Sequence, residues 1–522
     1  MTHIFFSVNI NILFAITLFV GIDSQLVAQD QRPNILIAIS DDHSFPHASA
    51  YGAKFVETPA FDRIANEGIL FMNGWAPSPG CSPSRAAILT GRYPWQIEEA
   101  GTHASTFPDK YVVFPDLLED VGYWVGFTGK GWGPGDWEVS GRDRNPAGPA
   151  FQDVRLDPPH QYISNIDYAG NFEEFLEQRP DDSPFYFWLG TSEPHRAYEQ
   201  GIGLEAGKRL EDADVPAYLP DTPEVRSDLL DYAVEIEWFD SHLARSIQIL
   251  EEIGELDNTI IIVTSDQGMP FPRAKANLYE DGLHVPLAVR WGDAVIGGRV
   301  VNDLVSLIDF MPTILEASEI DHPGDFPMTG RSLMEILTSS EEGIVDPKRD
   351  AVFAGRERHS YSRWDNHTYP IRAIRTHQYL YIRNFAPERW PAGAPRRIVD
   401  GELTPMHSGY HDIDSAPSLD VLTDNAEDPY FYNYLHLSVG KRPAEEVYDI
   451  LKDPACLNNL ALDPDYDQVT QYLRNRLMNF LDKTGDPRVT GNGDIWENYP
   501  RLRGPMREFP TPEWALPTQG NH

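Results

Sequence analysis

Apolar runs alternate with amphipathic stretches through the first two thirds of the sequence. The runs at 34–40, 185–190 and 259–265 consist mostly of apolar residues, a pattern typical of strands buried on both faces of a sheet. Helical spacing of apolar residues, clearest over 223–256, predicts helices between them. Further strands are expected at 123–128 and 285–291, and further helices at 59–68 (capped by Thr58), 114–121 and 171–178. This alternation predicts an α/β fold with a large, mostly parallel sheet flanked by helices.

The pattern changes near residue 350. Residues 369–375 and 378–383 predict an antiparallel hairpin, which is followed by an irregular, proline-rich stretch and a helix near 468–481. The tail after Asp486 is rich in Pro, Gly and Arg and is expected to wrap the surface. We therefore predict an N-terminal domain over 29–348 and a smaller C-terminal subdomain with an antiparallel sheet over 349–522.

The first residues have the pattern of an export signal. Residues 4–20 are almost wholly apolar, and Leu-Val-Ala at 26–28 resembles a cleavage site, although a basic start is missing. The run is short for a membrane span and leads into polar residues, so we predict a secretory signal peptide over 1–28. No cysteine follows it, which argues against a lipoprotein anchor. The mature protein is expected in the periplasm or outside the cell.

Composition limits the classes of partner. The chain has 522 residues, 41% hydrophobic content and a formal net charge of −38, with an isoelectric point of about 4.6. Such a surface repels nucleic acid and anionic membranes, so neither is an expected partner. An anionic substrate would need a local basic pocket. The chain has two cysteines, Cys81 and Cys456. In an exported protein, one interpretation is that they form a disulfide bond.

Polar side chains follow the predicted buried strands. Asp41 and Asp42 follow the first, and Lys130, His195 and Asp266 come shortly after three others. Ligands of open α/β sheets bind at the carboxyl ends of the strands, so we expect these groups to converge. The three aspartates offer hard oxygen ligands for Ca²⁺ or Mg²⁺. A loop turn would explain the Asp41-Asp42 pair alone, but Asp266 after a second strand favours a metal.

The stretch 79–92 begins as a loop of small residues and continues as a helix. Pro83 suits the first helical turn, so Cys81 lies at or just before a helix N-terminus, where free N–H groups favour an anion. Arg85, one turn further on, can bind the same anion through two N–H groups. An ordinary thiol at a helix start is the alternative interpretation.

The spacing Cys81-x-Pro83-x-Arg85, followed by Leu-Thr-Gly-Arg at 89–92, resembles the signature of the formylglycine-dependent (type I) sulfatases. The resemblance extends over nearly the whole mature chain, through the motifs at 33–42, 129–130, 194–195, 265–268, 275–286 and 446–461. Residues 81–86, 220–223, 269–272 and 277–279 are most similar to the heparan N-sulfatase (sulfamidase) branch. That branch also contains bacterial enzymes that act on other sulfated polysaccharides, algal ones included.

The resemblance implies a fold, a cofactor and a set of site residues. The fold would be an alkaline-phosphatase-like sandwich. A formylglycine-generating enzyme would oxidise Cys81 to an aldehyde (3-oxoalanine), whose hydrate attacks sulfur. A divalent cation, calcium (Ca²⁺) with Mg²⁺ as the alternative, would be held by Asp41, Asp42, Asp266, Gln267 and the modified Cys81. The implied catalytic residues are Cys81, Arg85, Lys130, His195 and Lys275.

Substrate contacts beyond the sulfate are expected from loops of the C-terminal subdomain. Arg356, His359, His367 and the segment 407–411 could bind sugar hydroxyls or a uronate, although each could equally be plain surface.

Two positions depart from the family pattern. Gln267 stands where the family usually has Asn, so its amide oxygen is one methylene further from the backbone. The family histidine shortly after Lys130 is absent around Trp132, and His43, His47 and His103 are alternative bases.

The functional hypothesis is an exported sulfatase that hydrolyses sulfate esters of a sulfated polysaccharide or its oligosaccharides, with an algal one such as ulvan among the candidates. One alternative is an N-sulfoglucosamine sulfohydrolase acting on heparan-type N-sulfate. Others are a phosphodiesterase or phosphonate hydrolase of the same superfamily, and a non-catalytic glycan-binding homologue.

Overall fold

An eight-stranded sheet organises the larger part of the chain. Its strand order is β3-β4-β1-β5-β6-β2-β7, with β8 also paired to β2. Strands β3, β4, β1 and β5 are mutually parallel, whereas β6 runs antiparallel to both β5 and β2. The strands are β1 (Asn34–Ser40), β2 (Ile69–Trp75), β3 (Trp124–Gly129), β4 (Phe185–Gly190), β5 (Thr259–Ser265), β6 (His284–Trp291), β7 (Arg299–Val301) and β8 (Val305–Ser306). The predicted large, mostly parallel sheet is confirmed.

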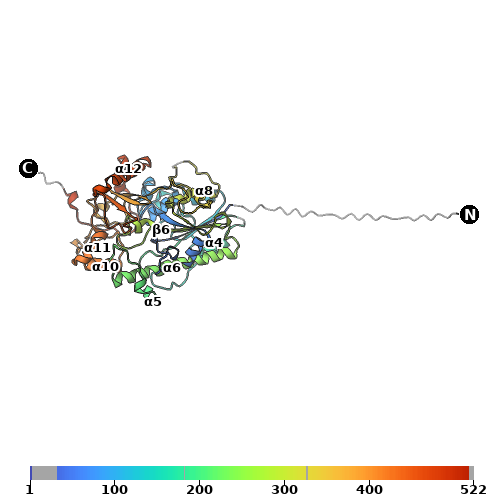
Figure 1. The fold of residues 1–522 in the computed structure, drawn as a ribbon, viewed down its shortest axis with the longest axis horizontal. Helices are drawn as coiled ribbons and strands as arrows, with labels where there is room; N and C mark the ends of the chain where they lie inside the picture. Colours follow the sequence, from blue (N-terminus) through green and yellow to red (C-terminus); the bar gives the residue numbers. More distant parts are fainter. Residues whose placement is uncertain (3–31, 182, 325–326, 517–522) are drawn as a thin grey trace, which may run out of the picture. The chain divides into compact units, whose positions relative to one another are not determined.

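Helices cover both faces of this sheet, which is why the central strands are apolar throughout. In β1, Ile35 and Ile37 face a core shared with α2, α3 and α8, whereas Leu36 and Ala38 face a core shared with α1, α4 and α6. In Figure 1, α6 is the long green helix, and α8 lies across the sheet from it. The helices are α1 (Pro59–Glu67), α2 (Cys81–Thr90), α3 (Phe114–Asp120), α4 (Tyr168–Glu177), α5 (Ile202–Glu205), α6 (Pro223–Glu252), α7 (Glu280–Leu283), α8 (Phe310–Ala317) and α9 (Met334–Leu337).

A separate antiparallel sheet follows, in the order β14-β11-β10-β9. The predicted hairpin is its central pair, and the predicted helix α12 covers it through Leu473, Leu477 and Leu481. The strands are β9 (Ala351–Arg356), β10 (Ile371–Thr376), β11 (Tyr379–Asn384) and β14 (Glu445–Asp449), with a two-stranded ribbon of β12 (Ile398–Val399) and β13 (Glu402–Leu403). The helices are α10 (Pro417–Asp424), α11 (Pro429–Val439), α12 (Asp467–Lys483), α13 (Pro487–Thr490) and α14 (Ile495–Asn498). The domain boundary at 348/349 stays a prediction.

The computed structural model describes residues 1–2, 32–181, 183–324 and 327–516. The hydrophobic core and the cleavage site of the predicted signal peptide lie outside these residues. Among the described helices, none has the length and apolar character needed to cross a membrane.

Helix α1 shows how distant residues complete a predicted element. Thr58 is its N-cap residue, but the Thr58 side chain makes no capping hydrogen bond. Asp240 of α6 instead accepts hydrogen bonds from the backbone N–H groups of Ala60 and Phe61, at 2.9 and 2.8 Å. These N–H groups have no partner within the helix, so α6 provides the cap.

The turn after β3 depends on a glycine. Gly129 has φ +66, and a Cβ at this position would lie 2.0 Å from the carbonyl oxygen of Gly190 in the neighbouring strand β4. The same carbonyl accepts the backbone N–H of Lys130 at 2.6 Å. The close approach therefore orients the Lys130 side chain towards the end of the sheet.

We expect Gly129→Ala to lower the free energy of unfolding by about 3 kcal/mol or more, because the positive φ and the clash both oppose a side chain. Gly122→Ala is the matched control, since Gly122 has φ +93 but nothing within 4 Å of its added Cβ. Gly122→Ala should lower the free energy of unfolding by only about 1 kcal/mol. Equal losses in chemical denaturation of the two variants would contradict this account.

Candidate active site

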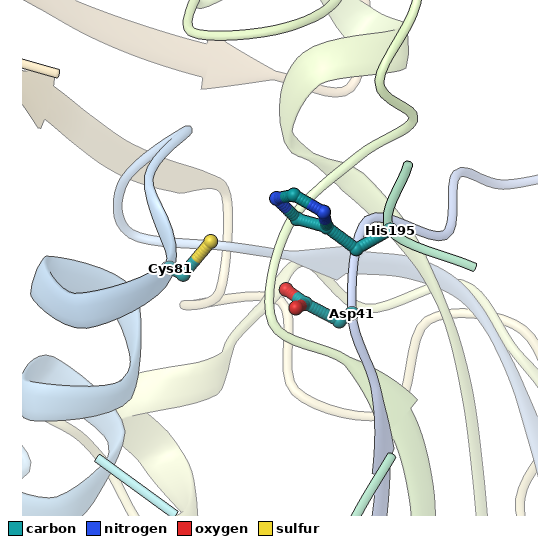
Figure 2. Close-up of side chains that lie close together, drawn as sticks. All are labelled: Asp41, Cys81 and His195. Carbon is teal, nitrogen blue, oxygen red and sulfur yellow. The ribbon is translucent and has the colours of Figure 1, made fainter. Parts of the chain in front are cut away.

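Cys81 is the first residue of α2, and its side chain is 1% exposed. The Cys81 Sγ accepts a hydrogen bond from Gln267 Nε2 at 3.2 Å. Asp41, just past the end of β1, and His195, in the loop after β4, point towards this sulfur (Figure 2). Both cysteines are free, so the disulfide interpretation is wrong.

Three carboxylates meet at this end of the sheet. One oxygen each of Asp41, Asp42 and Asp266 lies within 4.8 Å of the others, and all three residues are buried. Backbone hydrogen bonds continue the sheet ladder beyond the strands, from Asp41 N to Glu193 O at 3.0 Å and from Asp266 N to Ser40 O at 3.2 Å. The carboxylates are therefore held together by the backbone of three adjacent strands.

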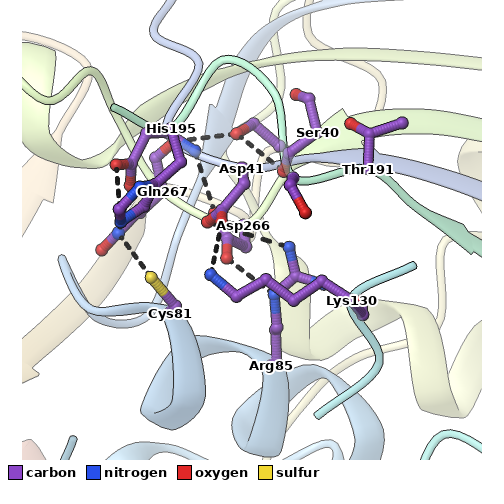
Figure 3. A network of polar contacts seen from close by, with 12 residues as sticks. Ser40, Asp41, Cys81, Arg85, Lys130, Thr191, His195, Asp266 and Gln267 are labelled. Carbon is purple, nitrogen blue, oxygen red and sulfur yellow. Dashed lines mark hydrogen bonds and ion pairs between the residues drawn. The ribbon is translucent and has the colours of Figure 1, made fainter. Parts of the chain in front are cut away.

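Three cations balance these carboxylates, as Figure 3 shows for two of them. Lys130 pairs with Asp41, and Lys275 pairs with Asp42. Arg85 Nε donates to Asp266 Oδ2 at 2.7 Å. The Arg85 guanidinium also donates to the carbonyl oxygen of Gly131 at 3.2 Å, which ties α2 to the loop after β3.

The same charges shift the pKa values of the site. Burial alone would raise the pKa of Asp41, but the charges of Lys130, His195 and Arg85 hold that pKa well below its usual range. Burial and the neighbouring Asp41 charge raise the pKa of Asp266. Burial and the Asp41 charge also raise the pKa of the Cys81 thiol well above its ordinary value. The thiol as it stands is therefore protonated and a poor nucleophile.

The site fits a hard divalent cation. Two oxygens of the site, Asp41 Oδ1 and Gln267 Oε1, are buried without a hydrogen-bond partner among the described residues. Buried oxygens of this kind are the ligands that Ca²⁺ or Mg²⁺ prefers. The amide of Gln267 reaches both Asp42 and Cys81, so the longer side chain still lies within the site.

A cleft of about 400 Å³ opens over Cys81. Its walls carry basic and imidazole side chains, contributed by both parts of the chain. The lining residues are Cys81, His103, Lys130, Gly133, Pro134, His195, His359, Ser360, His411, Asp414 and Arg501.

Two of these histidines form a stacked pair. The rings of His103 and His359 lie 4.4 Å apart between centroids, and Arg501 donates to the His359 carbonyl oxygen at 2.6 Å. Burial, followed by the charge of Lys275, lowers the pKa of His359 to about 3. Burial and the His359 charge lower the pKa of His103 well below its usual value. Both imidazoles are therefore neutral at pH 7, and both are weaker bases than a free imidazole.

The structure separates the three histidines considered as alternative bases. His103 lines the cleft, whereas His43 and His47 do not. The ring of His43 bonds to the carbonyl oxygen of His47 at 2.7 Å, away from the cleft lining. Trp132 occupies the region of the absent family histidine, and its indole N–H donates to Ser82 O at 3.0 Å.

The predicted substrate residues occupy different positions. His359 lines the cleft, but Arg356 is buried and pairs with Asp412, and it is not among the lining residues. His367 bonds to the Trp364 carbonyl oxygen at 2.9 Å. Within 407–411, His411 lines the cleft. A direct substrate contact by Arg356 stays a prediction.

Sequence reasoning missed Asp414 and Arg501. Asp414 Oδ2 lies 3.4 Å from Lys275 Nζ, and together with Asp42 and His195 it forms a second group of metal-ligating side chains. Burial would raise the pKa of Asp414, but the charges of Lys275 and His195 hold it at about 2. Neither residue follows a predicted strand, so no pattern marked them.

Comparison with models of known protein families gives two matches. Residues 33–320 match the family model described as Sulfatase, which covers more than half of the chain. Residues 273–391 match the model described as N-sulphoglucosamine sulphohydrolase, C-terminal.

Individual relatives agree with these matches. Human N-sulphoglucosamine sulphohydrolase is 28% identical over 507 residues, covering 89% of this chain and 93% of the human protein. An ulvan-active sulfatase of Formosa agariphila is 26% identical over 481 residues, covering 87% of this chain and 76% of that protein. A structure solved in complex with its substrate D-glucosamine-2-N,6-O-disulfate has a TM-score of 0.62 at 22% identity and covers 87% of this chain and 98% of the other. This last likeness shows the fold alone.

Proposed function

The chain belongs to the sulfatase family and hydrolyses sulfate esters, and from this premise we propose that its substrate is a sulfated polysaccharide or its oligosaccharides. The observation that carries the proposal is the cleft over Cys81, which is lined by Lys130, Arg501 and four histidines in a strongly acidic protein. Basic and imidazole side chains around one cleft suit an anionic group carried by a larger molecule.

The relatives support a glycan as that larger molecule. Their names include a sulphohydrolase of N-sulphoglucosamine and a sulfatase active on ulvan. A second candidate function is hydrolysis of heparan-type N-sulfate, which the match of residues 273–391 to the N-sulphoglucosamine sulphohydrolase model favours.

Cys81 is the proposed site of conversion to formylglycine by a formylglycine-generating enzyme. The hydrated aldehyde supplies an oxygen nucleophile for sulfur in place of the thiol. The raised pKa of Cys81 agrees with this role, because the unmodified thiol is protonated. Gly80 and the start of α2 hold the residue next to Asp41 and Gln267.

Asp41, Asp42, Asp266 and Gln267 are the proposed ligands of Ca²⁺, with Mg²⁺ as the alternative. A divalent cation bound there supplies positive charge for a sulfate oxygen and for ionisation of the nucleophile. Arg85, Lys130 and Lys275 balance the remaining negative charge around the sulfuryl group.

His195 is the proposed proton donor to the leaving oxygen. Its ring is partly exposed in the cleft, its Nε2 lies 3.8 Å from Asp42 Oδ2, and its Nδ1 lies 2.6 Å from the Arg196 carbonyl oxygen. The carbonyl partner of Nδ1 fixes the orientation of the ring, so that Nε2 faces Asp42. Lys275 is the alternative donor.

His103 is the proposed proton acceptor on the Cys81 side of the cleft. Its neighbour Ala104 donates a backbone hydrogen bond to Ser82 Oγ at 3.0 Å, which fastens this loop to the start of α2. Its imidazole lines the cleft together with Cys81 and stacks on His359, and this position is the support for its role as the base that the Trp132 region lacks.

We propose that the mature protein acts in the periplasm or outside the cell, after removal of residues 1–28. The support is the apolar segment at 4–20 and the small-residue site at 26–28. N-terminal sequencing of the protein from its host tests this.

Cys81→Ala should abolish sulfate release without unfolding the protein, because it removes the nucleophile's precursor. The readout is sulfate released from polysaccharides with defined desulfation, including N- and O-sulfated heparan and ulvan. Cys456→Ala, at the other buried cysteine, is the control and should keep its activity. Retained activity in Cys81→Ala, or an unconverted thiol in the Cys81 peptide by mass spectrometry, would overturn the scheme.

Free Ca²⁺ at a hundredfold excess over its dissociation constant should stabilise the protein by about 2.7 kcal/mol, measured as a rise in melting temperature. Asp266→Asn should lose most of this response. Asp303→Asn, a buried aspartate that caps the backbone at 345–346, should keep it. Equal Ca²⁺ responses in the two variants would contradict the assigned site.

His103→Gln should lower kcat by about a hundredfold, which is typical of a lost general base. His47→Gln should change kcat by no more than a few-fold, since His47 does not line the cleft. Melting temperatures of both variants separate folding from catalysis. The assignment fails if the His47 variant shows the larger loss of kcat at equal stability.

A further inference from the structure

A second pocket lies beside the cleft over Cys81, and the proposed function does not use it. It has a volume of about 180 Å³ and is lined by three tryptophans, three arginines, prolines and small residues. The lining residues are Arg363, Trp364, Arg389, Trp390, Ala394, Pro395, Arg396, Pro510, Thr511, Pro512 and Trp514. We refer to it as the tryptophan pocket.

Three segments connect the cleft to the tryptophan pocket. Ser360 lines the cleft and Arg363 lines the pocket, and their Cα atoms lie at most roughly 11 Å apart because the two residues are three positions apart in the sequence. The backbone N–H of Tyr410, which precedes the cleft residue His411, donates to the Ala394 carbonyl oxygen at 3.0 Å. The chain after Arg501 in the cleft continues to the pocket wall at 510–514. The two cavities are therefore neighbours.

The aromatic side chains of the pocket remain accessible. The rings of Trp364 and Trp514 meet edge to face at 5.8 Å between centroids, and Trp514 is 40% exposed. Trp364 and Trp390 are half-buried. Trp364 also stacks on His367 at 5.3 Å between ring centroids, and the indole surface that stays exposed at the pocket suits the apolar face of a pyranose ring.

The arginines give the pocket its charge preference. The guanidinium of Arg363 is engaged by Asp412, the Ser362 hydroxyl and backbone carbonyl oxygens, and Arg389 pairs with Glu497. Arg396 differs, because only its Nε donates, to the Thr404 carbonyl oxygen at 2.6 Å, and its two terminal nitrogens donate to no other residue in the described part of the chain. They can bind a carboxylate or sulfate.

From these observations we infer that the tryptophan pocket is a second sugar subsite, which binds a sulfated or uronate-containing pyranose of the same glycan, one or more units away from the sulfate that is removed. The ring stacks on the tryptophans, and its anionic group binds Arg396. The acidic neighbours Asp365 and Glu513 do not line the pocket. The inference rests on the proposed function, since it requires a glycan in the cleft.

The test compares binding of short and long glycans by full-length Cys81→Ala protein, which cannot turn them over. Isothermal titration calorimetry would use a tetrasaccharide and a disaccharide from heparan sulfate and from ulvan. We expect Arg396→Gln and Trp364→Ala each to weaken tetrasaccharide binding by about tenfold and to leave disaccharide binding unchanged. Arg474→Gln and Trp238→Ala, an arginine on α12 and a half-buried tryptophan on α6, are the matched controls.

Unchanged tetrasaccharide affinity, or equal losses for both lengths, would overturn the second subsite. Arg396→Gln keeps the test valid if Trp364→Ala fails to fold, because Arg396 is only partly buried. Failure of the proposed function would be recognised separately, because the wild-type protein would then release no sulfate from any of the glycans.

Discussion

The close burial of three carboxylates at one end of the sheet is the constraint on which the site depends. Asp41, Asp42 and Asp266 lie within 4.8 Å of one another, where unbalanced like charges would destabilise the fold. Their balancing cations come from α2, from the turn after β3 and from the loop before α7. The charge requirement therefore fixes these three segments relative to the strand ends, and with them the floor of the cleft.

Much of this arrangement could be predicted from sequence, because buried parallel strands have two signals. The first is the apolar run that marks each strand. The second is that the carboxyl ends of parallel neighbours meet at one edge of the sheet, so the residues after the strands, Asp41, Lys130, His195 and Asp266, could be expected to lie together. Strand β2 was missed because Asn73 and Gly74 interrupt its apolar pattern, and its pairing with β6 is antiparallel and shifted at Gly74.

The rest depended on tertiary contacts that no local pattern encodes. Asp414 and Arg501 belong to irregular segments, and their places in the cleft follow from contacts such as Lys275 with Asp414 and Leu502 N with Ala104 O at 2.7 Å. The choice of His103 among three histidines has the same origin. The net charge of −38 also gives no indication of the site, because basic side chains such as Arg85 and Lys130 still gather where the strands end.

The burial of Cys81 has a consequence for how the protein is made. A side chain that is 1% exposed, at the start of a packed helix, is closed to any modifying enzyme once the chain has folded. The proposed oxidation therefore belongs to the nascent or unfolded chain. Arg501, which lines the cleft over Cys81, is synthesised more than 400 residues after Cys81. Ribosomal synthesis thus leaves an interval in which the thiol is already made but cannot yet be covered.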